Sequence, residues 1–127
     1  MVIENKDATR GKDGISMVPA KVLKLTFLLY PCEEDNNKFV VHCLELDVVA
    51  VGDTRPAAID LLKQLIEDLI AASIEDGTYE KILRPAPPEY WRMLARAKPY
   101  RPPQSVIEHH IRSSAISDVG YAQLVAV

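Results

Sequence analysis

The chain has 127 residues, of which 48% are hydrophobic and 26% charged, and its formal net charge is −3. This composition is typical of a globular protein with a buried core, and the length suits one domain rather than two. No run of about 18 apolar residues predicts a membrane-spanning helix, and the first twenty residues lack the apolar segment of a secretory signal. We therefore expect a cytoplasmic protein with a flexible tail over residues 1–20 and one domain over residues 21–127.

The charges are distributed unevenly along the chain. Residues 32–80 contain twelve acidic and three basic side chains, a local balance of −9. Residues 81–112 contain seven basic and two acidic ones, a local balance of +5. Such a split suits the steering of a charged partner, and it is equally compatible with an ordinary solvated surface.

Three strands are predicted in the first half of the domain. Residues 22–30 (VLKLTFLLY) largely alternate between apolar and polar side chains, which is typical of a strand with one buried face. Residues 39–44 (FVVHCL) are rich in β-branched and aromatic side chains, and residues 48–51 (VVAV) precede Gly52. The polar connections between these runs predict an antiparallel meander.

A long amphipathic helix is the next predicted element. Asp53 or Thr54 can cap its first turn, and Pro56 lies where a missing N–H is tolerated. Its apolar residues cover about half of the helical circumference, more than a core-facing stripe needs. The surplus either buries more core or contacts a second subunit. Asp76–Gly77 is expected to end the helix.

The remaining residues, 84–127, are expected to form an extension of the same domain. Prolines interrupt regular structure before Pro88, which can open a short helix. The pattern predicts a helix, an extended connector, a strand, a loop and a second strand, at residues 88–97, 98–103, 105–112, 113–120 and 121–127 respectively.

One string of residues in this order of elements resembles a known family. The stretch Phe39–Asp47 (FVVHCLELD), followed by Gly52-Asp53-Thr54 and an apolar helix, is similar to the HicB-like antitoxin superfamily. The resemblance covers residues 22–73 and implies an α+β fold with an antiparallel β-β-β-α core, a partial RNase H fold. It also implies a protein-binding module that neutralises a small ribonuclease toxin and lacks the RNase H catalytic residues.

The chain departs from this family in two places. Relatives usually carry acidic residues just after the threonine, whereas this chain has Pro56 and Ala57 there. Many relatives also end in a helical module that binds DNA. Residues 104–127 instead predict strands and a loop, with Arg112 as the one basic residue, so DNA binding is not expected.

Candidate catalytic and metal-binding residues are few. Glu45, Asp47 and Asp53 are the carboxylates that a two-metal nuclease would need, since they lie near the ends of the second and third predicted strands. Asp53 is equally suited to capping the helix. The histidines are expected to be structural, because adjacent His109 and His110 point to opposite faces of a strand. No nucleophile or phosphate-binding motif is present in the sequence.

Cys32 and Cys43 are expected to be reduced thiols, because the sequence predicts no secretion signal. They are expected to be structural, because their spacing matches no CxxC or zinc-ligand pattern. We therefore expect no enzymatic activity, no metal and no cofactor. Tyr90 and Trp91 lie beside basic residues and suggest either stacking on RNA bases or a plug at the edge of the core.

The expected function is antitoxin-like binding of a small basic ribonuclease, with Glu45 and Asp47 facing that partner. Two alternatives remain open: a stand-alone oligomeric scaffold without a toxin partner, and RNA binding through residues 81–112. The C-terminal strands are expected either to extend the sheet or to pair with a second subunit. We therefore expect a homodimer or higher homo-oligomer, whose interface the sequence does not specify.

Overall fold

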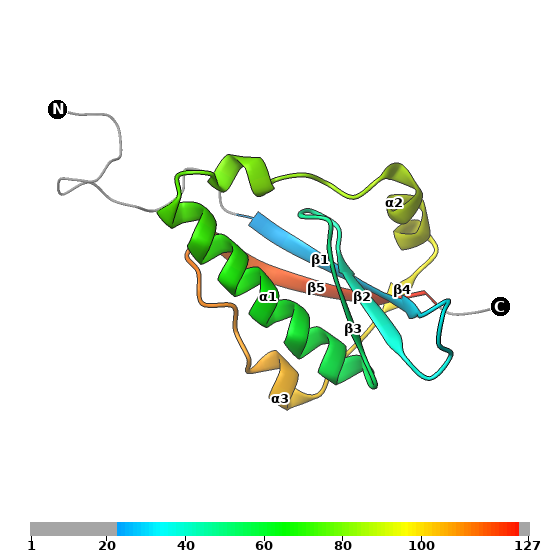
Figure 1. Ribbon diagram of the computed structural model, residues 1–127. Helices are drawn as coiled ribbons and strands as arrows, with labels where there is room; N and C mark the ends of the chain where they lie inside the picture. Colours follow the sequence, from blue (N-terminus) through cyan, green and yellow to red (C-terminus); the bar gives the residue numbers. More distant parts are fainter. Residues whose placement is uncertain (1–22, 125–127) are drawn as a thin grey trace, which may run out of the picture.

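The protein, described here by a computed structural model for residues 23–124, is built on a mixed five-stranded sheet with helices on both of its faces (Figure 1). The predicted tail over residues 1–20 lies outside the described residues. The elements in chain order are β1 (Leu23–Pro31), β2 (Phe39–Cys43), β3 (Val48–Gly52), α1 (Arg55–Glu75), a short 3-10 helix (Tyr79–Ile82), α2 (Pro88–Ala95), β4 (Lys98–Pro99), α3 (Gln104–Ile107) and β5 (Ile116–Gln123).

The predicted β-β-β-α core is confirmed. β1 pairs antiparallel with β2, and β2 pairs antiparallel with β3. Of the two candidate caps of α1, Asp53 and Thr54, the cap is Thr54. Its hydroxyl accepts a hydrogen bond from the N–H of Ala57 at 3.1 Å. Gly77 follows the helix with a positive φ of 70°, a conformation that glycine adopts without a steric cost.

The C-terminal elements differ from the prediction. Residues 105–112 do not form a strand: the chain makes the single-turn helix α3 and then continues without regular structure. The buried side chain of this region is Val106, whereas Ile107 is exposed, so the alternation that suggested a strand does not describe burial. The predicted loop at residues 113–120 is also wrong, because β5 begins at Ile116.

β5 changes the character of the sheet. The strand order is β3-β2-β1-β5-β4, and β5 pairs parallel with β1. The sheet is therefore mixed rather than purely antiparallel. The C-terminal strand lies between β1 and β4, and β4 pairs with only its last two residues, Ala122 and Gln123. At the other end of the sheet, β3 is the edge strand, and its outer edge is available to a partner.

Alternate side chains of β1 build a core on each face of the sheet. Leu25, Phe27 and Leu29 pack against the buried stripe of α1 and against Val106 of α3. Leu28 points to the opposite face, where it packs with Leu44, the segment before α2 and α2 itself. Figure 1 shows α1 and α3 on one side of the sheet and α2 on the other.

Within residues 23–124, no helix has the length and apolar character needed to cross a membrane.

Candidate functional site

Glu45 lies in the turn between β2 and β3 and is tied to the neighbouring strand β1. Its two carboxylate oxygens accept hydrogen bonds from the backbone N–H of Thr26 at 2.6 Å and from the Thr26 hydroxyl at 2.8 Å. Hydrogen bonds to an ionised carboxylate are among the stronger ones in proteins. Glu45 therefore braces this turn against β1. Its contact with a partner, expected from the sequence, stays a prediction.

Asp47 is the more exposed residue of the two and belongs to a polar chain that leads into the α2 face of the sheet. One of its carboxylate oxygens lies 2.7 Å from Nε2 of His42, and Nδ1 of the same ring lies 3.2 Å from the hydroxyl of Tyr30. Burial raises the pKa of Tyr30 to about 12, so this hydroxyl stays protonated. Because the Asp47 carboxylate only accepts, the matching neutral tautomer has its proton on Nε2, and Nδ1 accepts from the Tyr30 hydroxyl. Nε2 of the buried His42 then carries the proton that is donated to Asp47.

Glu45, Asp47 and Asp53, the carboxylates that a two-metal nuclease would need, do not lie close together. Glu45 and Asp47 lie before β3 and Asp53 lies after it, so the whole strand separates them by about 16 Å at 3.3 Å per residue. Asp53 instead accepts a hydrogen bond of 2.6 Å from the ammonium of Lys38, which lowers the pKa of its carboxyl group. Three carboxylates held this way cannot share two metal ions about 4 Å apart.

β3 is an unprotected edge of the sheet. Among the described residues it pairs only with β2. Its five residues, VVAVG, contain no charge and no proline, the features that commonly block pairing at edge strands. Val49 and Val51 are 47% and 44% exposed. They lie on the face opposite α1, next to β2 and beyond the cluster that α2 covers.

The flank of α1 that borders β3 is also apolar and uncovered. On the other flank, Asp60, Lys63 and Glu67 hydrogen-bond to the chain segment between α3 and β5 or to α3 itself. The 3.6-residue period places Leu61 and Leu65 on the opposite side of the buried stripe. These two side chains are 45% and 40% exposed. Within residues 23–124, the surplus apolar face of this helix is thus only partly buried.

We call Val49, Val51, Leu61 and Leu65 the β3–α1 surface. These are four of the five large hydrophobic side chains with high exposure among the described residues. Because α1 packs over β3 and β2, the two leucines and the two valines flank the same open strand edge from opposite faces of the sheet.

Comparisons with protein families, curated proteins and solved structures gave no match. The resemblance to the HicB-like superfamily therefore stays a prediction from the sequence.

The exposed charges of α1 after Arg55 are acidic, and two of them, Asp60 and Glu67, lie on the flank away from Leu61 and Leu65. Lys63 is the one basic residue between Pro56 and Gly77, and it is buried. All the charged side chains of this stretch that reach solvent are consequently acidic, and they are Asp60, Glu67, Asp68, Glu75 and Asp76. Asp47 adds a further exposed carboxylate at the start of β3. The structure thus strengthens the acidic character of this region, because it removes a positive charge from its surface.

The aromatic pair of α2 packs on the sheet. Tyr90 and Trp91 contact the cluster of Leu28 and Leu44, and the indole N–H of Trp91 donates to the carbonyl of Ala86 at 3.0 Å. The plug interpretation from the sequence agrees with this packing. Because protein covers part of these two rings, less of their surface is free to stack on nucleic-acid bases.

The three histidines do not converge. His42 contacts Asp47 on the α2 face of the sheet, whereas Nδ1 of His109 lies 3.0 Å from a carboxylate oxygen of Asp60 on α1. His110 is exposed. Within residues 23–124 no group of three or more His, Cys, Asp or Glu side chains is arranged to hold a metal ion.

Sequence reasoning missed the β3–α1 surface as a site. The available signal was the composition of β3, because an uncharged run of VVAV is unusual for an edge strand. That signal acquires meaning only once the strand order shows that β3 lies at the edge.

Proposed function

We propose that this chain is an antitoxin-like, protein-binding module of the cytoplasm that holds a small basic ribonuclease on the β3–α1 surface. The observation that carries the proposal is the uncharged, unpaired edge of β3 with exposed apolar side chains on both sides of it. An open edge offers backbone N–H and C=O groups that a strand of another protein can pair with.

Strand addition at β3 would combine two sources of affinity. Backbone hydrogen bonds along Val48–Gly52 would fix the register of the incoming strand. Its apolar side chains would cover Val49 and Val51 on one face, and a neighbouring element of the partner would cover Leu61 and Leu65 on the other. Each side chain of this size stabilises a complex by about 1–2 kcal/mol when half of its surface is removed from water.

The charge around the surface supports a basic partner. The exposed charges of α1 after its first residue are acidic, and Asp47 lies at the start of β3. A ribonuclease must attract the phosphate backbone of RNA, so its surface is expected to be basic. Complementary charge of this kind accelerates association and makes it dependent on salt.

The experiment compares three tagged proteins purified from the native host: the unmodified chain, Val51→Lys and Ser114→Lys. Val51→Lys places a charge on the open edge, whereas Ser114→Lys places the same charge on an exposed loop position outside the surface. We expect the unmodified chain and Ser114→Lys to retain a small basic protein at near-equal molar amounts, and Val51→Lys to lose it.

The retained protein is then assayed for RNA cleavage. We expect it to cleave RNA alone and to be inhibited by the unmodified chain and by Ser114→Lys, but not by Val51→Lys. A retained protein without ribonuclease activity contradicts the antitoxin proposal. Equal inhibition by Val51→Lys contradicts the assignment to β3.

A second candidate is a stand-alone scaffold in which β3 pairs with β3 of a second copy. Antiparallel pairing about Ala50 would place Val49 of one copy opposite Val51 of the other, with no charge within the paired strands. The purified chain would then be a dimer by light scattering at micromolar concentration, and Val51→Lys would convert it into a monomer. A monomeric unmodified chain contradicts this candidate.

A further inference from the structure

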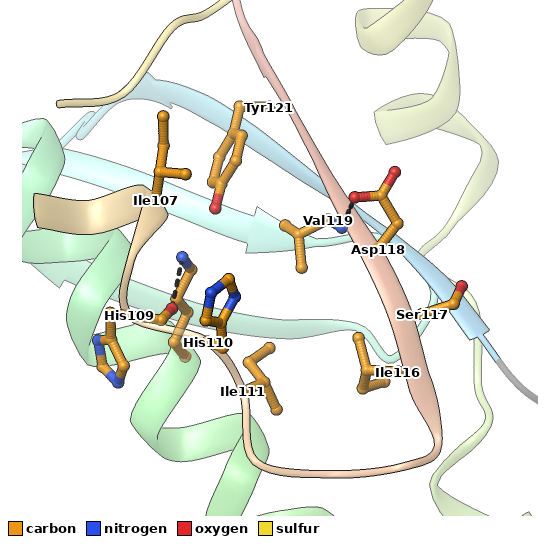
Figure 2. A pocket seen from close by; sticks show the side chains of 10 residues that line it. Ile107, His109, His110, Ile111, Ile116, Ser117, Asp118, Val119 and Tyr121 are labelled. Carbon is orange, nitrogen blue, oxygen red and sulfur yellow. Dashed lines mark hydrogen bonds between the residues drawn. The ribbon is translucent and has the colours of Figure 1, made fainter. Parts of the chain in front are cut away.

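A cavity lies on the α1 side of the sheet, away from the β3–α1 surface. Its volume is about 290 Å³, near the lower end of the range for sites that bind small molecules. It is bounded by Lys63 of α1, by residues 107–111 and by residues 116–121 of β5 (Figure 2). The structure thus joins Lys63 and two neighbouring C-terminal segments, more than forty residues away in sequence, around one space.

Lys63 supplies a buried positive charge at this cavity. Its side chain is 3% exposed, and its ammonium donates to the carbonyls of Val106 at 2.7 Å and His109 at 2.8 Å. These acceptors are neutral. No carboxylate of the described chain lies within 4 Å of the ammonium, and the nearby Asp60 is bonded to the His109 ring. Desolvation accordingly lowers the pKa of Lys63.

An ammonium makes three hydrogen bonds, and two of those of Lys63 go to protein carbonyls. The charge of Asp60 acts on Lys63 without contact, and a buried cation without a contacting counter-charge is unfavourable. An anion in the adjoining cavity would provide both the missing charge and the third acceptor.

Tyr121 adds a second donor. Its hydroxyl points into the cavity (Figure 2) and has no hydrogen-bond partner among the described residues. Burial raises the pKa of Tyr121 to about 12, so the hydroxyl remains protonated at neutral pH. The ammonium of Lys63 lies 5.4 Å from the centre of the Tyr121 ring. The two donors are therefore close enough to contact one ligand. The imidazole of His110 also points into this space (Figure 2).

The acidic and hydroxyl side chains of β5 point elsewhere. The pairing of β1 with β5 shifts by one residue between Leu23 and Lys24, which leaves Ser117 as an extra residue in β5. Ser117 and Asp118 consequently lie on the far side of the strand, whereas Val119 faces the cavity (Figure 2). Asp118 nevertheless lines the cavity, and its charge and that of Asp60 contribute to the raised pKa of Tyr121. Both carboxylates already accept a hydrogen bond within the chain, Asp118 from the N–H of Val119 and Asp60 from the ring of His109.

The remaining wall is apolar. Ile111, Ile116 and Val119 line the cavity and pack against the core below it. A purely inorganic anion would leave these side chains without a partner.

We propose that this cavity binds a small organic acid, with its carboxylate between Lys63 and Tyr121 and a short hydrocarbon chain against Ile111, Ile116 and Val119. This site is separate from the β3–α1 surface, so the proposal does not depend on the antitoxin function.

The test is a titration of the whole chain with butyrate, followed by ¹H–¹⁵N NMR and calorimetry. Butyramide is the neutral control of the same shape, and phosphate is the control for anions without a hydrocarbon chain. Tyr121→Phe removes only the hydroxyl and keeps the ring that packs edge-on against Phe27. Tyr100→Phe is the matched variant, because Tyr100 does not line the cavity.

We expect saturable binding of butyrate in the millimolar range or tighter, with chemical shift changes confined to the cavity residues. Loss of one hydrogen bond to a charged group should weaken binding roughly tenfold in Tyr121→Phe, and Tyr100→Phe should bind like the unmodified chain. Lys63→Met should abolish binding. Lys63→Met also removes the hydrogen bonds to two carbonyls and can destabilise α3. Tyr121→Phe is therefore the variant that decides the test.

The proposal would be overturned by no saturable binding of butyrate, by equal binding of butyramide, or by unchanged affinity in Tyr121→Phe. Binding of phosphate as tight as that of butyrate would also overturn it, because the hydrocarbon chain would then contribute nothing.

Discussion

Gly52 lies directly against the backbone of Ala58 in the first turn of α1. A Cβ atom added to Gly52 would be 2.7 Å from the Ala58 nitrogen and 2.9 Å from its Cα, distances that real Cβ atoms do not show. This contact gives a physical reason for glycine in the Gly52-Asp53-Thr54 turn: it lets the end of β3 and the start of α1 approach closely, so that the helix packs on the sheet.

Gly52→Ala should lower the free energy of unfolding by roughly 2 kcal/mol or more, because backbone atoms of α1 must move to admit the methyl group. Gly120→Ala is the control, since its Cβ would meet only the Leu25 carbonyl at an ordinary 3.9 Å. Urea unfolding of the two variants measures the difference. Equal stabilities would show that the turn adapts without cost.

The two candidate caps of α1 can be separated by substitution. The Thr54 hydroxyl accepts a hydrogen bond from the N–H of Ala57, whereas Asp53 is exposed and bonded to Lys38. Thr54→Ala should therefore cost about 1 kcal/mol of stability, and Asp53→Ala should cost less, because exposed ion pairs contribute little. Thermal unfolding at matched pH provides the measurement. A larger loss for Asp53→Ala would identify Asp53 as the cap.

Asp47 has a positive φ of 54° and binds the buried His42. Asp47→Ala should destabilise the protein by roughly 1–3 kcal/mol, because it leaves a buried imidazole N–H without an acceptor and keeps the left-handed backbone. Asp47→Asn retains an acceptor and tolerates this conformation, so its loss should be smaller. Chemical unfolding of both variants tests the order. Equal losses would show that the bond to His42 is not what stabilises the turn.

Stability should fall at alkaline pH because two tyrosines are partly buried. The pKa values of Tyr30 and Tyr121 are each raised from 10.0 to about 12, first by desolvation and then by nearby charges. The folded state thus keeps its protons to higher pH than the unfolded chain. The stability that these groups contribute is complete below pH 10 and is lost as the pH rises through about 12.

Two further groups act in this pH range. Burial raises the pKa of Cys43 from 9.0 to about 12. Like the tyrosines, Cys43 therefore lowers the stability as the pH rises, and its effect begins near pH 9. The lowered pKa of Lys63 has the opposite sign, because the folded chain releases that proton first and gains stability as the pH rises toward 10.5. Urea unfolding across this range should show a net decline. Tyr121→Phe should flatten it, and an unchanged slope would contradict the assignment to Tyr121.

Local patterns were enough for the first half of the fold. The period-two and period-3.6 spacings of residues 23–75 depend on neighbours a few positions apart, and these residues form β1, β2, β3 and α1 as predicted. The same reasoning failed after Pro99. There, short segments are shaped by what they pack against: Val106 reaches the core from a single helical turn, and β5 is completed by its pairing with β1.

The sequence by itself determined the α+β class, the meander with its long helix, the Gly-Asp-Thr turn and the acidic balance of residues 32–80. Only the tertiary structure decided that β5 inserts beside β1 and leaves β3 as an open edge, that Glu45 is tied to Thr26, and that Lys63 is buried at a cavity. The physical reason is the range of the interactions. Periodicity and capping act within one or two turns, whereas strand order and burial depend on pairing between residues from opposite ends of the chain.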